Sequence, residues 1–178
     1  MKKVTRIVLV ALAGVLFTAL VSNAQSKNKV RKLEYNSAYN YEVATVAVGV
    51  DGTKLIKVWG YGHTVEDAIR KAKADAVACA IVKGFPAGSG GSAAKTPPIC
   101  TDSDAIQKNA EYFEKFFEPG GQYLQYVNLS NDGAPSGADR IKVNKKTYKV
   151  GIVVSIAFDE LRKELEKQGI ARKLDAGF

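Results

Sequence analysis

The sequence predicts an α+β domain, in which two to three helices pack on an antiparallel or mixed sheet of about five strands. Three observations carry this prediction: a hairpin signal at Asp51-Gly52, an amphipathic helix over residues 64–84, and a long alternating strand over residues 147–158. The expected order is strand, strand, helix, helix, strand, strand, strand, helix. Strands and helices grouped in this way favour α+β over a strictly alternating parallel α/β sheet.

The first hairpin is indicated by Asp51-Gly52, which lies between the apolar segments YEVATVAVGV and TKLIKVWGYG. Both residues suit the positive φ angles of a two-residue type I′ turn. Such a turn places Val48 opposite Leu55. Because both faces of the hairpin are rather apolar, we expect the sheet to be covered on both sides, at least in part.

The main helix follows at once. Thr64 can cap its first turn, Asp67 can reach back to complete a capping box, and Gly84 can end the helix. A core-facing stripe recurs at i, i+3 and i+4 spacing, and it consists of Val65, Ala68, Ile69, Ala72, Ala76, Cys79 and Ala80. The solvent side is expected to carry Arg70, Lys71, Lys73 and Asp75.

The second half of the chain predicts one helix over residues 104–117 and a strand over 122–129. A second hairpin follows, with strands over 140–143 and 147–158 around a turn at 144–146. Asp159 is expected to cap a last helix, which carries Leu161 and Leu165 and ends at Gly169.

Residues 1–24 have the parts of a secretory signal peptide: Lys2, Lys3 and Arg6, an apolar run over 7–21, and small residues before Gln25. The run is shorter than the roughly 20 residues of a spanning helix, which favours cleavage over an uncleaved anchor. A flexible basic arm (25–40), a single α+β domain (41–170) and a C-terminal tail (171–178) are then expected. The protein is predicted to be exported, to the periplasm or in association with the outer membrane, with no transmembrane segment after cleavage.

Cys79 and Cys100 are the only cysteines, and both lie in the exported part. An even number of cysteines in an oxidising compartment predicts a disulfide. Such a bridge would contribute about 3 kcal/mol by the chain-entropy estimate. The alternative is a buried Cys79 thiol on a helix face and an unrelated, exposed Cys100.

The segment over 84–100 (GFPAGSGGSAAKTPPIC) raises the question of a phosphate-binding loop. A Walker A loop requires glycines at set distances before its Lys-Thr pair, and a helix directly after it. With Lys95-Thr96 in that place, Ser89 and Ala94 stand at the glycine positions, and two prolines exclude a following helix. The segment is therefore predicted to be a mobile or surface-laid connector, and no cofactor is expected.

His63 is the only histidine. A metal site would need further histidines or clustered cysteines and carboxylates, and the sequence around His63 supplies no nucleophile elbow. We therefore predict no metal site and favour a non-catalytic protein. Carboxylates assembled in space, or His63 itself, keep a small secreted hydrolase as an alternative.

One charge cluster is a candidate binding surface. Its five cations lie within ten residues: Arg140, Lys142, Lys145, Lys146 and Lys149. They fit either a solvated hairpin that protects its edge with charges or a surface that binds an anionic partner. If the cluster does not bind, the first other candidate is the side of the second helix that carries Tyr112 and Phe116.

A family resemblance rests on three segments: WGYG at 59–62, the alanine-rich TVEDAIRKAKADAVACA, and KVGIVVSIAFDELRKEL near the end. With them, residues 41–169 resemble the small α+β domain in the N-terminal part of flagellar-assembly T proteins. This domain also occurs in a family of twenty-kilodalton bacterial surface lipoproteins. The resemblance implies a non-catalytic, envelope-associated module that docks onto larger assemblies, and it supplies no catalytic residues. The chain differs in having Gln25 instead of a lipid-attached cysteine, and in an insertion over 85–100.

The formal charge of +8 includes the three cations of the signal, and 23 basic and 18 acidic residues remain without them. Because most extracytoplasmic space lacks nucleic acid, this excess favours an envelope protein assembly or an anionic envelope polymer as partner. The sequence therefore predicts an exported, non-catalytic binding or assembly module of the bacterial cell envelope. The alternatives are the hydrolase and a structural subunit of a surface polymer.

Overall fold

The computed structural model describes residues 42–49, 51–130, 135 and 137–173. The predicted signal peptide, the basic arm and the last five residues of the tail lie outside these described residues. The predicted fold class is confirmed, because the described part is an antiparallel five-stranded sheet with helices packed on it.

The sheet has the strand order β1-β2-β5-β3, with β4 also paired to β5. Its strands are β1 (Val43–Val48), β2 (Thr53–Gly62), β3 (Val127–Leu129), β4 (Arg140–Asn144) and β5 (Thr147–Ala157). β2 pairs with residues 148–157 of β5 on one side. On its other side, β5 pairs with β4 near its start and with β3 near its end.

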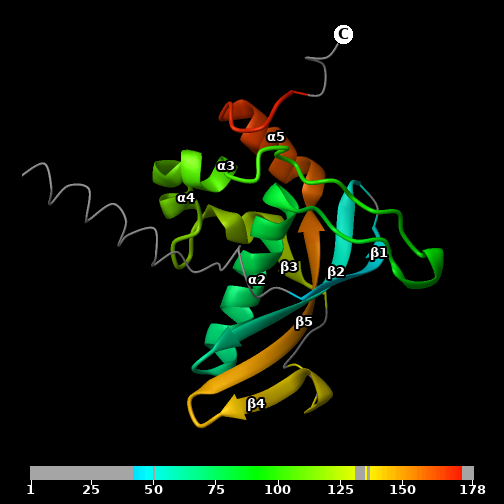
Figure 1. Ribbon diagram of the computed structural model, residues 1–178, viewed down its shortest axis with the longest axis vertical. Coiled ribbons are helices and arrows are strands. Elements are labelled where there is room, and N and C mark those ends of the chain that lie inside the picture. The colour runs from blue at the N-terminus through cyan, green and yellow to red at the C-terminus, as the bar shows by residue number, and fades with distance from the viewer. Residues whose placement is uncertain (1–41, 50, 131–134, 136, 174–178) are drawn as a thin grey trace, which may run out of the picture. The chain divides into compact units, whose positions relative to one another are not determined.

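Helix α2 crosses one face of this sheet, and α5 lies at the end of the sheet where β5 finishes (Figure 1). The α-helices of the described part are α2 (Val65–Val82), α3 (Ala105–Lys108), α4 (Ala110–Phe116) and α5 (Phe158–Lys167). Three short 3₁₀ helices accompany them: η1 (Ser89–Gly91), η2 (Gln122–Tyr126) and η3 (Gly137–Asp139). The β4–β5 hairpin is at the end of β5 that is remote from α5 (Figure 1).

The first hairpin forms with positive φ angles at Asp51 and Gly52, as predicted. Its register differs from the prediction, because Gly49 N–H donates to the Thr53 carbonyl and makes the loop one residue longer. Val48 therefore pairs with Lys54, and a bulge then shifts the rest of β1 by a further residue. β1 is also an edge strand with mostly exposed or half-exposed side chains, so the expected cover on both faces is wrong for this strand.

Helix α2 has the predicted ends. Thr64 Oγ1 accepts a hydrogen bond from the Asp67 N–H at 3.1 Å, and Gly84 ends the helix with a φ of 73°. The C-terminal half of the helix is buried all round, however. Asp75, predicted on the solvent side, is only 5% exposed. The segment that contains Cys100 donates main-chain hydrogen bonds to the carbonyls of Ala80 and Ile81 in the last turn, which a two-sided helix pattern does not anticipate.

The predicted helix over 104–117 is two helices, because Asn109 leaves helical geometry between α3 and α4. The side-chain amide of Asn109 donates a hydrogen bond to the Ala105 carbonyl at 2.8 Å. The predicted strand over 122–129 is strand only in β3, and the residues before it form η2. Tyr123 is completely buried there, so aromatic burial rather than strand alternation explains this segment.

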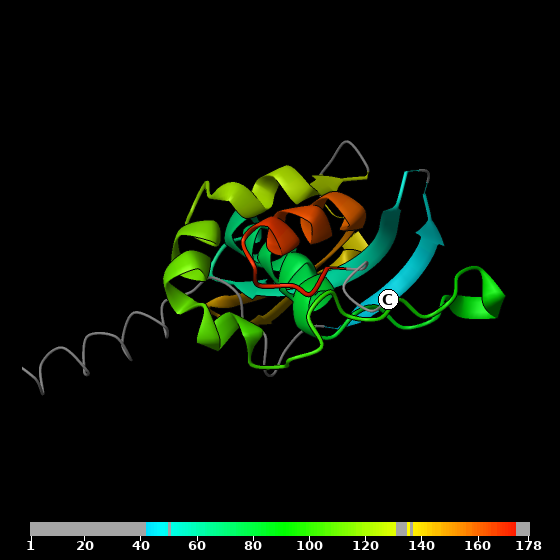
Figure 2. The same cartoon turned by 90° about the horizontal axis from the view of Figure 1, so that it is seen from above.

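The glycine-rich connector is a folded hairpin that projects beyond β1 (Figure 2). The main chains of Phe85 and Thr96 exchange two hydrogen bonds at its base, and the Thr45 hydroxyl donates to the Pro86 carbonyl. Gly90 and Gly91 form the exposed tip. In the described part of the chain, no helix has both the length and the apolar character needed to cross a membrane.

Candidate functional site: the basic end of the domain

Four of the five predicted cations form what we call the basic end: Arg140, Lys142, Lys145 and Lys146. All four are exposed, and β4 is exposed over its whole length. The tight turn of the hairpin consists of the two lysines, since Asn144 pairs with Thr147 on either side of them. None of the four makes an ion pair with a described residue.

Strand alternation sets the direction of the first two cations. Arg140 pairs with Val150 and Lys142 with Tyr148, so both lie on the face of the hairpin that continues the helix-covered face. The charged groups of both are 5.8 Å from the centre of the Tyr148 ring. This cation–π geometry places the two cations side by side on one aromatic surface.

Lys149 is separate from the basic end. It lies on the opposite face of the hairpin, where its ammonium group is 2.7 Å from a carboxylate oxygen of Glu42 and 4.9 Å from the Trp59 ring centre. The hydrogen bond to Glu42 raises the pKa of Lys149. Lys149 therefore does not share the face of Arg140 and Lys142, because neighbouring strand positions point to opposite faces.

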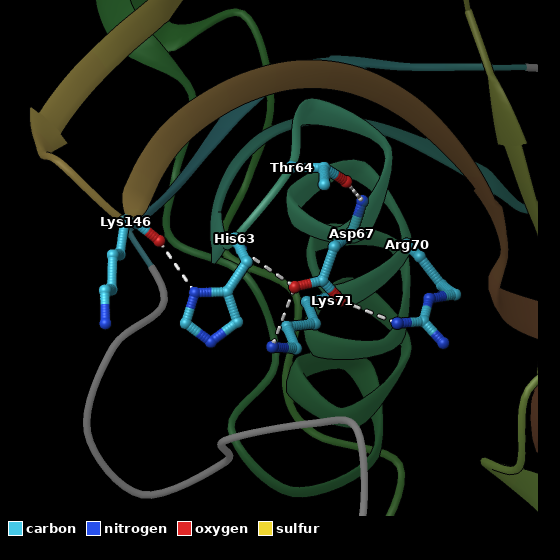
Figure 3. Close-up of polar contacts among 6 residues, drawn as sticks. All are labelled: His63, Thr64, Asp67, Arg70, Lys71 and Lys146. Carbon is cyan, nitrogen blue, oxygen red and sulfur yellow. Dashed lines mark hydrogen bonds and ion pairs between the residues drawn. The ribbon is translucent and has the colours of Figure 1, made fainter.

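His63 joins the start of α2 to the turn of the basic end (Figure 3). Its Nδ1–H donates to the main-chain carbonyl of Lys146, with 2.7 Å between nitrogen and oxygen. The two residues are 83 positions apart in the sequence. The His63 side chain is exposed, and its hydrogen bond holds the lysine turn against the β2–α2 junction.

Asp67 is the acidic centre of the same junction. Its carboxylate accepts the His63 main-chain N–H at 3.0 Å and lies 2.6 Å from Arg70 and 3.2 Å from Lys71 (Figure 3). Burial acts to raise the pKa of Asp67, but the His63 N–H and the two cations together hold it below its usual value. The predicted capping box differs in one bond, since Asp67 reaches back to His63 and not to Thr64.

This arrangement does not bring a carboxylate to the His63 ring. The described hydrogen bond of the ring goes to the Lys146 carbonyl, and the Asp67 carboxylate bonds the His63 main chain. Among the described residues, no group of three or more histidine, cysteine, aspartate and glutamate side chains could hold a metal ion. The geometry of the junction is that of a structural connection between two loops.

The second candidate surface differs from its prediction. Phe116 is only 1% exposed and packs between Tyr112 and Tyr126, with stacked ring centres at 5.5 and 6.0 Å. The Tyr112 hydroxyl is also buried, and it has no hydrogen-bond partner among the described residues. Burial, with the nearby Glu164 charge, raises its pKa. A pocket of about 550 Å³ does open beside these rings, and its lining is Lys108, Asn109, Ala110, Glu111, Tyr112, Lys115, Phe116 and Gln122.

The predicted disulfide is not present. Cys79 and Cys100 are buried thiols that are not within disulfide distance of each other. The Cys79 sulfur is 3.1 Å from the Gly84 carbonyl oxygen, whereas that of Cys100 faces the Ile170 carbonyl oxygen at 3.9 Å. The two sulfurs therefore face different main-chain carbonyls.

The exposed strands also carry apolar side chains, which the charge pattern did not predict. Every large apolar side chain that is exposed in the described part lies on β1, β3 or β4, and these are Val46, Val48, Leu129, Ile141 and Val143. In β4 they alternate with the cations of the basic end. The signal was present as the pattern RIKVN, which the charge count alone did not reveal.

Comparisons of the chain with models of known protein families, with curated proteins and with solved structures found no match. The resemblance to the flagellar-assembly and surface-lipoprotein domains therefore stays a prediction.

Proposed function

We propose that this chain is an exported, non-catalytic binding module of the bacterial cell envelope, and that its basic end contacts an anionic partner there. The observation that carries the proposal is a contrast between neighbouring cations. Arg70, Lys71 and Lys149 are each bound to a carboxylate, whereas the four cations of the basic end make no ion pair with a described residue. Arg140 has an electrostatic interaction with the Glu66 carboxylate but no ion-pair contact. Exposed cations without ion pairs attract an anionic partner and steer its approach.

Two contacts support a preformed binding surface at this end. The Tyr148 ring aligns Arg140 with Lys142, and the His63 ring holds the Lys146 main chain. Holding charged groups in place before binding reduces the entropy that their ordering would cost. The basic end therefore has the positioned charges that a docking module needs.

The proposed location is supported by the sequence. Residues 1–24 combine a basic start, an apolar run and small residues before Gln25. If the segment is cleaved, intact-mass measurement of protein from its native envelope gives a chain that begins at Gln25. Membrane-bound protein that retains Met1 would contradict cleavage.

The proposed function is tested with the double variant Lys145→Glu/Lys146→Glu. Binding of the purified protein to isolated cell envelopes is expected to fall about tenfold or more, and moderate salt is expected to weaken wild-type binding, because the Debye length shortens. The control is Lys167→Glu/Lys173→Glu, which makes the same change in net charge at exposed residues of α5 and the segment after it.

Two results separate the interpretations. If only the variant of the basic end loses binding, the position of the charge matters and the proposal holds. If both variants bind like the wild type and salt has no effect, the four cations are only a solvated edge and the proposed site is wrong.

A further inference from the structure

Among the described residues, nothing pairs with the outer edge of β4. β4 pairs with β5 alone, and no main-chain hydrogen bond joins β4 to another described residue. The other strand on this side of β5 is β3, which pairs with the far end of β5. A strand with one unpaired edge presents a row of N–H and C=O groups that can pair with another chain.

The side chains of β4 point alternately to the two faces of the sheet. Arg140 and Lys142 lie together over Tyr148, while Ile141 pairs with Lys149 and lies on the other face. Ile141 is 45% exposed and Val143 is 52% exposed. An added strand would therefore meet Arg140 and Lys142 on one face and Ile141 on the other, with Val143 at the register irregularity before Asn144.

We propose that β4 binds an extended acidic segment of a partner protein, which adds to the sheet as a further strand. This inference rests on the proposed function and names the class of partner for the same basic end. Main-chain hydrogen bonds to β4 supply affinity, and alternating acidic and apolar side chains of the segment supply selectivity. Since β4 has five residues, the paired core of the segment is of similar length.

Charge favours this occupant over a second copy of the chain. Two β4 edges placed together would bring the cations of one copy opposite those of the other, and directly opposed like charges destabilise a strand pair. The other exposed edge, β1, has the sequence VATVAV and carries no charge. It therefore has no charged side chain with which to select an acidic segment.

The apolar residues favour a polypeptide over an anionic polymer. A polymer of phosphates or uronic acids would use the cations but would gain little from Ile141, Val143 or the main-chain groups of the edge. A polypeptide strand can contact the cations, the apolar side chains and the main-chain groups. Different substitutions in β4 are therefore expected to weaken the binding of a polypeptide and the binding of an anionic polymer.

The test uses a capped heptapeptide of alternating glutamate and valine, with inorganic polyphosphate as the polyanion probe, and measures binding to the purified protein by calorimetry. Two further peptides carry N-methyl groups on one or the other alternate set of amides. Only one set can face β4. One methylated peptide is therefore expected to lose binding about tenfold or more, and the other to bind like the parent peptide.

Protein variants test the side chains. Ile141→Ser/Val143→Ser is expected to weaken binding of the peptide about fivefold to tenfold and to leave binding of polyphosphate unchanged. The matched control is Val46→Ser/Val48→Ser, which makes the same change on the exposed β1 edge and is expected to leave the peptide unchanged. Circular dichroism of each variant checks that it is folded.

The outcomes distinguish this inference from the proposed function. If both methylated peptides bind like the parent, and Lys145→Glu/Lys146→Glu weakens peptide and polyphosphate alike, the basic end binds anions but strand addition is wrong. If Lys145→Glu/Lys146→Glu changes the binding of neither the peptide nor polyphosphate, the proposed function fails as well. Self-association in sedimentation, with no peptide binding, would identify a second copy as the occupant and overturn the inference.

Discussion

The main chain of Gly60 lies directly against that of Ala68. A Cβ atom placed on Gly60 would be 2.2 Å from the Ala68 carbonyl oxygen and 2.7 Å from the Ala72 nitrogen. Helix α2 therefore approaches β2 more closely than any residue with a side chain at position 60 would permit. Gly62 has the same relationship to Ala68, since its Cβ would be 2.4 Å from the Ala68 nitrogen.

We expect Gly60→Ala to lower the free energy of unfolding by about 2 kcal/mol or more, because the added methyl group meets main-chain atoms that cannot rotate away. Urea denaturation followed by circular dichroism measures the loss. Gly137→Ala is the control, since no described atom lies within 4 Å of the added methyl group, and a change within about 0.5 kcal/mol is expected. Equal stability of the Gly60 variant and the control would show that α2 can move away from the sheet.

The bond from His63 to the Lys146 carbonyl predicts a difference between two substitutions. His63→Ala removes the donor and is expected to cost about 1 kcal/mol, with faster hydrogen exchange of the turn amides. Lys146→Ala keeps the main-chain carbonyl that accepts the bond, so it is expected to leave stability and exchange unchanged. Faster exchange in both variants would mean that the lysine side chain, and not the histidine, orders the turn.

The lowered pKa of Asp67 predicts a pH-dependent contribution to stability. Because the folded pKa is below the unfolded value of about 3.9, the contribution is fully present above that value and is lost as the pH falls through the folded pKa. We expect Asp67→Asn to cost about 1 kcal/mol at neutral pH and much less at the acidic end of the folded range. Urea titrations at both pH values measure the difference.

Glu118→Gln is the control for Asp67, because Glu118 is exposed and makes no ion pair with a described residue. A cost for Asp67→Asn that stays constant with pH would show that the lost interactions do not depend on the carboxylate charge.

The two buried cysteines predict slow reaction with thiol reagents. Burial raises the pKa of Cys100, the neighbouring Arg162 partly opposes this shift, and only the thiolate reacts. In the folded protein we expect both thiols to be nearly inert, and in urea without reductant both should titrate. Reductant should leave the melting temperature unchanged. Unfolded protein without reactive thiols would instead support the disulfide that the sequence predicted.

Local chemistry in the sequence was enough for several elements. Asp51-Gly52 predicted a turn because few other residue pairs accept two positive φ angles. Thr64 and Gly84 predicted the two ends of α2 because each satisfies main-chain groups within one turn of itself. The alternation in β5 predicted its buried face, and the spacing of cations predicted four residues of the basic end. Each of these inferences depends on interactions between residues close in sequence.

Other features were decided only by tertiary packing. Asp75 and Phe116 are buried because distant segments cover them. The pattern of a helix predicts the face that packs on the sheet, but it does not predict which other segments cover the remaining faces. The bond between His63 and Lys146 has the same origin, since the fold alone brings positions 83 residues apart into contact. Composition and compartment predicted a disulfide between Cys79 and Cys100, yet the fold does not bring their sulfurs within disulfide distance. The burial of a side chain and its contacts with residues distant in sequence depend on which elements pack together. That packing is a property of the whole fold.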